Sequence, residues 1–127
     1  MIKFKRTDHV NICVAPERLE EARAFYVDVL GFEPIQRPDH VFATPGYWFN
    51  VAGIEWHIGV EQPVAGSFRH TAFEVNDLAA ARQHLENNGI QIIDEPVIPN
   101  RNRFTFYDPF GIRMEFLEYT APPNSPR

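Results

Sequence analysis

An internal repeat constrains this chain more than any other feature. The segment Gly-Ile-Glu-Trp-His-Ile at residues 53–58 recurs as Gly-Ile-Arg-Met-Glu-Phe at residues 111–116. Each copy also has a histidine near its start, His9 in the first and His70 in the second. The position of His57 in the first copy is held by Glu115 in the second, and both side chains bind divalent metals. The repeat therefore predicts one structural unit used twice, with a histidine at its start and a histidine or glutamate at its end.

The length and composition predict a single small domain with its own core. The chain has 127 residues, of which 44% are hydrophobic, and this is enough apolar side chain to form a core without disulfide bonds. We expect one module at about residues 7–62, a second at about 68–119, and a mobile tail at 120–127. Cys13 is the sole cysteine, and a small buried thiol is its expected role.

Charge and hydropathy exclude several classes of partner. The net charge is −5 and the twelve basic residues are scattered, so a nucleic-acid surface is not expected. No apolar run approaches the ~20 residues of a membrane span. The first residues lack the apolar segment of a secretory signal. The prediction is a cytoplasmic protein that binds neither nucleic acid nor membrane.

The polarity pattern of the first module predicts one helix among several strands. Residues 7–14 alternate between polar and apolar, which is typical of a half-buried strand that carries His9 on its polar face. A helix is predicted from Pro16 to Leu30, with Gly31 as its C-cap. The remaining predicted elements are a strand at 32–37, a loop or weak strand at 39–46, a hairpin of 47–51 with 55–61, and a linker at 62–67.

The second module repeats this order. It predicts a strand at 69–75, then a helix that begins after an N-cap at Asn76 or Asp77 and ends at Asn88-Gly89. A strand at 90–94 and a hairpin of 104–107 with 112–119 complete it. Each module therefore reads as βαβββ, and the fold class is α+β.

These motifs resemble those of the vicinal oxygen chelate superfamily, which includes glyoxalase I, bleomycin-resistance proteins, fosfomycin-modifying enzymes and extradiol dioxygenases. The resemblance runs from about Asp8 to Tyr119. It implies that two tandem βαβββ modules pair into a cupped mixed sheet with the helices on the outside, either within one chain or by exchange across a homodimer. It also implies that the first and last strands of the modules supply metal ligands. The segments that carry it are residues 8–12, 25–32, 69–73 and 108–116, and the implied ligands are His9, His57, His70 and Glu115.

The donor types restrict the metal. Imidazole nitrogens with one carboxylate suit Zn, Ni, Fe, Co or Mn better than Mg or Ca, which prefer oxygen ligands. A six-coordinate ion with four protein ligands keeps two positions for the oxygens of a small-molecule substrate. A lone histidine on a strand is more often structural, and His40 and His84 are expected to be solvent-side residues.

Candidates for substrate contact lie near the predicted ligands. Trp48 and Trp56 could line an aromatic pocket, although ordinary core packing is the competing interpretation. Arg101 and Arg103 could pair with a carboxylate or phosphonate, and solvated surface charge is the alternative. No Ser-His-Asp pattern, phosphate-binding glycine loop or nicotinamide fingerprint is present, so the metal would perform the chemistry.

Three function classes follow. The first is a metal-dependent glyoxalase-like lyase or isomerase, in which Glu115 is a ligand and the candidate base for proton transfer. The second is an extradiol-type Fe(II) dioxygenase that uses His9, His70 and Glu115. The third is an antibiotic-sequestering or fosfomycin-type resistance protein.

Overall fold

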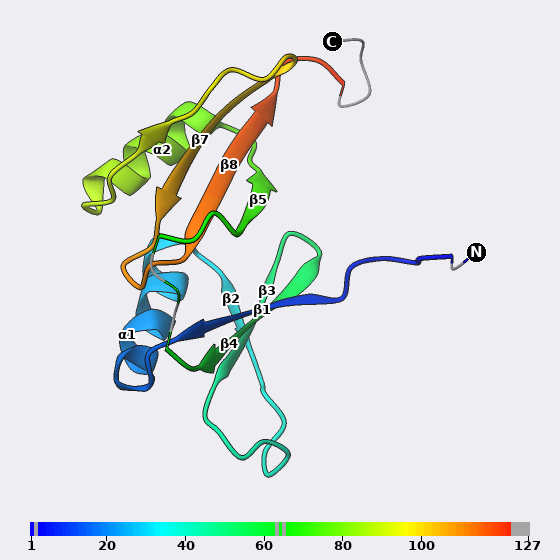
Figure 1. Ribbon diagram of the computed structural model, residues 1–127, viewed down its shortest axis with the longest axis vertical. Helices are drawn as coiled ribbons and strands as arrows, with labels where there is room; N and C mark the ends of the chain where they lie inside the picture. The colour runs from blue at the N-terminus through cyan, green and yellow to red at the C-terminus, as the bar shows by residue number, and fades with distance from the viewer. Residues whose placement is uncertain (2, 63, 65, 123–127) are drawn as a thin grey trace. The chain divides into compact units, whose positions relative to one another are not determined.

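The computed structural model describes residues 1, 3–62, 64 and 66–122, and the chain divides between residues 63 and 64 into two compact units. Each unit has one four-stranded sheet and its own helix (Figure 1). The first unit contains β1 (His9–Val14), α1 (Leu19–Ala24), β2 (Glu33–Ile35), β3 (Tyr47–Val51) and β4 (Ile54–Val60). The second contains β5 (His70–Glu74), α2 (Leu78–Asn87), β6 (Ile93–Asp94), β7 (Arg101–Tyr107) and β8 (Arg113–Tyr119).

The two sheets have the same topology. The strand orders are β1-β4-β3-β2 and β5-β8-β7-β6. In each, the first strand pairs in parallel with the last, and the other pairings are antiparallel. A parallel pair needs a long crossover connection, and the helix of each unit lies in that connection. The prediction of an α+β fold made of two tandem βαβββ modules is confirmed.

The helix of the first unit is more irregular than predicted. A 3-10 turn at Pro16–Arg18 precedes α1, and a π-helical segment at Phe25–Val29 follows it. In that segment the amide of Leu30 donates to the carbonyl of Phe25, which widens the last turn. Gly31 then takes a φ of 75°, where a residue without a side chain is favoured, and ends the helix as predicted.

An aromatic cluster forms the core of the first unit. Tyr26 and Trp56 are fully buried with ring centroids 5.9 Å apart, and Phe32 and Phe49 pack beside them. Successive residues of a strand point to opposite faces. Because Trp56 faces this core, its neighbour His57 faces the other side of the sheet.

The helix of the second unit begins and ends where the sequence predicts. The Asp77 side chain accepts from the amide of Ala80 as an N-cap. Asn88 is the C-cap, and Gly89 follows with a φ of 78°. Leu85 is the buried residue of this helix.

Several predicted strand boundaries are wrong. The strand predicted at 32–37 is limited to Glu33–Ile35, and the one predicted at 90–94 to Ile93–Asp94. Conversely β7 begins at Arg101 rather than Phe104, because the amide of Thr120 donates to the carbonyl of Asn100 and extends the ladder with β8. The segment 39–46 is a loop.

Two predictions fall partly or wholly outside the described residues. The predicted linker at 62–67 contains residues 63 and 65, and most of the predicted mobile tail lies at 123–127. Over the described residues, no helix has the length and apolarity that a membrane span requires.

Candidate metal centre

The strand register of the first unit places two predicted ligands together. His57 on β4 pairs with Asn11 on β1, two residues beyond His9, so His9 and His57 share one face of the sheet. Their imidazole rings are stacked, with centroids 4.3 Å apart and an angle of 16° between the planes. The first unit therefore contributes one pair of ligand-type side chains.

Each ring of this pair has one nitrogen engaged by a carboxylate. Nδ1 of His9 lies 2.9 Å from Oδ2 of Asp8, and Nε2 of His57 lies 2.9 Å from Oε1 of Glu55. The hydrogen bond with His9, followed by the charge of Arg6, lowers the pKa of Asp8. A carboxylate on one imidazole nitrogen orients the ring and favours coordination through the other nitrogen. That other nitrogen is Nε2 in His9 and Nδ1 in His57.

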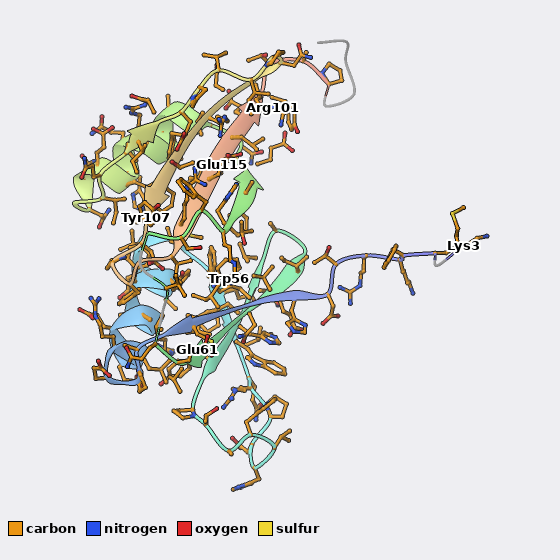
Figure 2. All side chains as sticks on the ribbon, viewed as in Figure 1. Lys3, Trp56, Glu61, Arg101, Tyr107 and Glu115 are labelled. Atoms are coloured by element: carbon orange, nitrogen blue, oxygen red, sulfur yellow. The ribbon has the colours of Figure 1, made fainter. Side chains whose placement is uncertain are left out.

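The second unit repeats the relationship with a different side chain. Glu115 on β8 pairs with Ala72 on β5, again two residues beyond the histidine, His70. Nε2 of His70 lies 3.8 Å from Oε1 of Glu115. Figure 2 shows Glu115 on β8 of this unit. The internal repeat in the sequence is thus also a repeat of strand register.

Two polar groups contact the Nδ1 atom of His70, which is the ring nitrogen that does not face Glu115. Its Nδ1 lies 2.9 Å from the carbonyl oxygen of Phe68, and Nη1 of Arg113 lies 3.2 Å from the same nitrogen. Nη2 of Arg113 donates to Glu95, which also accepts from the hydroxyl of Thr105 at 2.6 Å. The Thr105 hydrogen bond, with that of Arg113, lowers the pKa of Glu95. These contacts leave Nε2 of His70 directed toward Glu115.

Arg103 contacts the predicted ligand Glu115 rather than standing apart from it. Its Nη1 donates to Oε1 of Glu115 at 2.8 Å, and its Nη2 donates to the carbonyl of Pro96 at 3.0 Å. The two side chains are only 13% and 10% exposed. Sequence reasoning did not find Arg113 or Glu95, although Arg113 precedes Glu115 by two residues and therefore lies on the same face of β8.

The donors of the second unit fit one divalent ion. Two ligands that each lie about 2.1 Å from an ion are roughly 3.0 to 4.2 Å apart, depending on their angle. The 3.8 Å between His70 and Glu115 falls within that interval. Each unit brings together two ligand-type side chains, and within the described residues no group of three or more His, Cys, Asp or Glu side chains is placed so that it could hold a metal ion.

The remaining predicted substrate-binding residues are Trp48, Trp56 and Arg101, and each has a different environment. The indole of Trp48 stacks on His57, with centroids 4.0 Å apart and parallel planes. Trp56 lies in the core of the first unit, and the guanidinium of Arg101 lies 4.8 Å from the ring centroid of Tyr119. The predicted solvent-side residues His40 and His84 are exposed.

Comparison with known proteins identifies the family. The profile of the Glyoxalase/Bleomycin resistance protein/Dioxygenase superfamily matches residues 6–116. The chain belongs to this superfamily. A relative of this chain is the uncharacterized protein YaeR of Escherichia coli K12, which is 30% identical over 93% of this chain and 99% of its own length.

Two solved structures share the fold of this chain. A glyoxalase family protein from Bacillus anthracis is 39% identical, with a TM-score of 0.82 over 94% of this chain and 99% of its own. The fosfomycin resistance protein FosX of Listeria monocytogenes has a TM-score of 0.79 at 18% identity, over 93% of this chain and 95% of its own. That structure is of a FosX mutant in complex with Mn(II) and 1S,2S-dihydroxypropylphosphonic acid. At this identity FosX supports the fold alone.

Proposed function

We propose that this protein is a metal-dependent enzyme of the glyoxalase-like group that acts on a small oxygenated substrate by metal-assisted proton transfer. The observation that carries the proposal is the pair formed by His70 and Glu115, whose facing atoms are spaced for one divalent ion. The matching pair His9 and His57 would complete the set of four ligands. The proposal requires the two pairs to meet around one ion, within one chain or across a homodimer.

The residues around Glu115 suit the role of ligand and base. Arg103 donates to Oε1, which fixes the carboxylate and keeps it from rotating away. An oxygen that already accepts from a guanidinium is a poor acceptor for a further proton, so we assign proton transfer to Oε2. A bound divalent ion would polarise a substrate carbonyl and acidify the adjacent carbon. The carboxylate would then accept the proton from that carbon.

Metal loading tests the first part of the proposal. The chelator-treated protein is dialysed separately against Zn, Mn, Ni, Co and, without oxygen, Fe(II), and the bound metal is measured by elemental analysis. We expect one ion per set of four ligands, lost in His70→Ala and Glu115→Ala. The matched controls His40→Ala and His84→Ala change exposed histidines and should retain the metal. A protein that takes up none of these metals would contradict the proposal and favour a sequestering binding protein.

The reaction class is tested with the loaded protein. A lyase or isomerase exchanges a carbon-bound proton of its substrate with solvent deuterium and consumes no oxygen. An extradiol dioxygenase would instead consume oxygen while opening a catechol ring, and that result without proton exchange would overturn the assignment. Methylglyoxal with glutathione is one substrate pair to include.

The same preparations test the predicted homodimer. Light scattering at micromolar concentration should give twice the mass of one chain. A strict monomer in the presence of stoichiometric metal would remove the dimer and leave pairing within one chain.

A further inference from the structure

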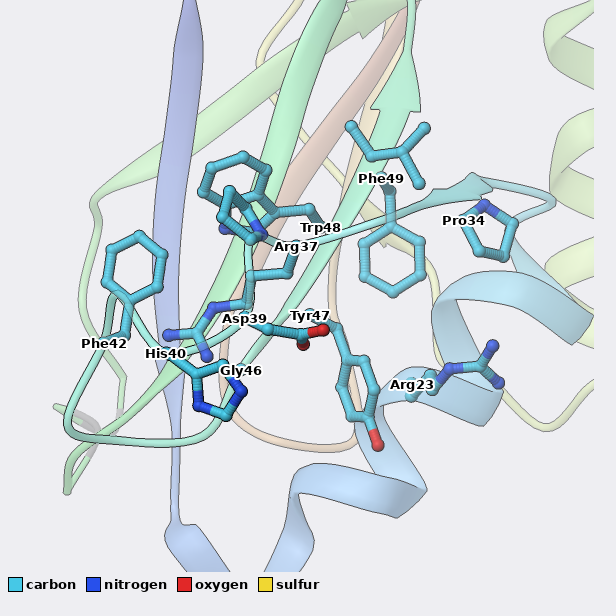
Figure 3. A pocket seen from close by; sticks show the side chains of 12 residues that line it. Arg23, Pro34, Arg37, Asp39, His40, Phe42, Gly46, Tyr47, Trp48 and Phe49 are labelled. Atoms are coloured by element: carbon cyan, nitrogen blue, oxygen red, sulfur yellow. The ribbon is translucent and has the colours of Figure 1, made fainter.

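A pocket separate from the four predicted ligands opens in the first unit. It has a volume of about 400 Å³, within the size range of small-molecule sites. The segment from Pro34 to Phe42, the start of β3 and one residue of α1 line it (Figure 3). Its charged and aromatic lining side chains include Arg23, Arg37, Asp39, Phe42, Tyr47 and Trp48.

Two arginines of this pocket have no acidic partner. Arg23 and Arg37 are half-buried, and among the described residues neither has a carboxylate within 4.0 Å. Arginines removed from water are normally paired with an acid. Instead their guanidinium groups lie over aromatic rings, that of Arg37 at 4.2 Å from the ring centroid of Phe42 and that of Arg23 at 5.3 Å from that of Tyr47. Stacking on a ring leaves the N–H edge of a guanidinium available to a ligand.

Two aromatic lining residues, Phe42 and Trp48, connect the pocket to the predicted metal ligand His57 through ring contacts. Phe42 packs edge-on against Trp48, with ring centroids 5.9 Å apart. Trp48 in turn stacks face to face on His57. A flat ligand in the pocket would therefore lie against the indole that covers His57.

The absence of a side chain at Gly46 leaves room for the guanidinium group of Arg37. A Cβ on Gly46 would lie 2.5 Å from the carbonyl oxygen of Ile58 and 3.2 Å from Cζ of Arg37. The strand ends thus approach each other closely at a residue without a side chain, and Arg37 lies over this point. The arginine is held by this packing without the help of an ion pair.

One carboxylate of the lining opposes an anion. Asp39 is exposed and lines the pocket together with the exposed His40. The other nearby acid, Glu20, is not a lining residue, and its carboxylate accepts a hydrogen bond from the hydroxyl of Tyr47. Among the side chains that line the pocket, two guanidinium groups stand against one carboxylate.

We propose that this pocket binds the carboxylate of a small flat acid, which the positive charges of its two arginines attract, with the aromatic rings of Phe42 and Trp48 against the planar body. This inference rests on the proposed function and names its substrate class, a conjugated or aromatic carboxylic acid. A carboxylate accepts two parallel N–H bonds from one guanidinium, and a planar body matches the indole face of Trp48.

Benzoate is the probe, and the full chain is used after chelator treatment so that no metal contributes to binding. Its affinity is measured by calorimetry and by tryptophan fluorescence, to which Trp48 should respond. Benzamide is the neutral probe of the same shape, and cyclohexanecarboxylate is the acid without a flat ring. We expect benzoate to bind at least tenfold more tightly than benzamide, as one charge-assisted hydrogen bond implies, and more tightly than cyclohexanecarboxylate.

Four variants test the inference. Arg37→Gln and Arg23→Gln should each weaken benzoate binding by about tenfold or more, and Asp39→Asn should tighten it because an opposing charge is removed. Arg69→Gln, which changes an exposed arginine of the other unit, should leave it unchanged. Equal binding of benzoate and benzamide, or unchanged binding in both arginine variants, would overturn the inference. Since the titration uses metal-free protein, its failure and a failure of metal loading are separate results.

Discussion

Nη1 of Arg103 lies 2.8 Å from Oε1 of Glu115, and both side chains are almost completely buried. Removal of one partner of such a pair leaves the other charge unpaired in a poorly solvated position, which destabilises a protein by about 3 kcal/mol or more. Arg103→Met should therefore lower the free energy of unfolding by about 3 kcal/mol at pH 7, measured by urea denaturation of the metal-free protein.

A surface ion pair of the same unit provides the control. Arg82 donates to Asp94 at 2.9 Å, but these side chains are 41% and 75% exposed. Solvent screens such a pair, so Arg82→Met should have a much smaller effect. Equal destabilisation by both substitutions would contradict the special role of the Arg103–Glu115 pair.

The Glu95 carboxylate should make the free energy of unfolding depend on pH in the acidic range. Its pKa is lowered from the ordinary 4.5, mainly by the Thr105 hydroxyl and then by Arg113. A group with a lowered folded-state pKa stabilises the fold above its unfolded-state pKa and loses that contribution as the pH falls through the folded-state value. The difference in unfolding free energy between the native protein and Glu95→Gln should thus be constant above about pH 5.5 and shrink below pH 4.5.

The buried hydroxyl provides a second check on this assignment. Thr105→Val removes the larger cause of the shift, so the acid-dependent loss of stability should begin at the same pH as in the native protein but be smaller and be complete at a higher pH. Denaturation curves from pH 3 to 7 compare the three proteins. The prediction would be contradicted if the unfolding free energies of the native protein and of Glu95→Gln changed with pH in parallel from pH 3 to 7.

Gly46 should tolerate no side chain. A Cβ there would clash with the carbonyl oxygen of Ile58 at 2.5 Å, and relief of the clash must move backbone. Gly46→Ala should cost about 1 to 3 kcal/mol of unfolding free energy and weaken benzoate binding, because Arg37 is displaced. Gly59→Ala is the control, since its nearest new contact would be Sγ of Cys13 at an ordinary 3.6 Å. Similar losses in both variants would contradict the steric argument.

The sequence repeat predicted the architecture because it records strand register. Periodic polarity located the strands, and the matching positions of His57 and Glu115 placed each beside the histidine of its own unit. The ends of the second helix were also predicted from the sequence, because Asp77 and Gly89 are residue types that favour the start and the end of a helix. These features depend on neighbours in sequence or on a periodic pattern, and one sequence contains both.

The surroundings of the site were less predictable. Arg103 was predicted to contact substrate, but whether it reaches Glu115 depends on the side-chain conformations of two strands. Glu95 joins the network from a loop without periodic pattern. The pocket above Gly46 depends on residues 39–46, which form no regular element. Such contacts arise from packing between distant segments, and no local pattern encodes them.

Glu55 provides a direct test of whether His57 is a ligand. Its Oε1 lies 2.9 Å from Nε2 of His57, so a metal would have to bind the remaining nitrogen, Nδ1, while Glu55 orients the ring. Loss of a carboxylate that orients a ligating histidine weakens metal binding by about 10- to 100-fold. Glu55→Gln should therefore weaken metal affinity by about tenfold in a chelator competition at fixed pH, while the metal-free protein unfolds at nearly the native temperature because Glu55 is partly exposed. His57→Ala should weaken it further. If both variants hold the metal as tightly as the native protein, His57 is a packing residue between His9 and Trp48, and the metal site consists of His9, His70 and Glu115 alone.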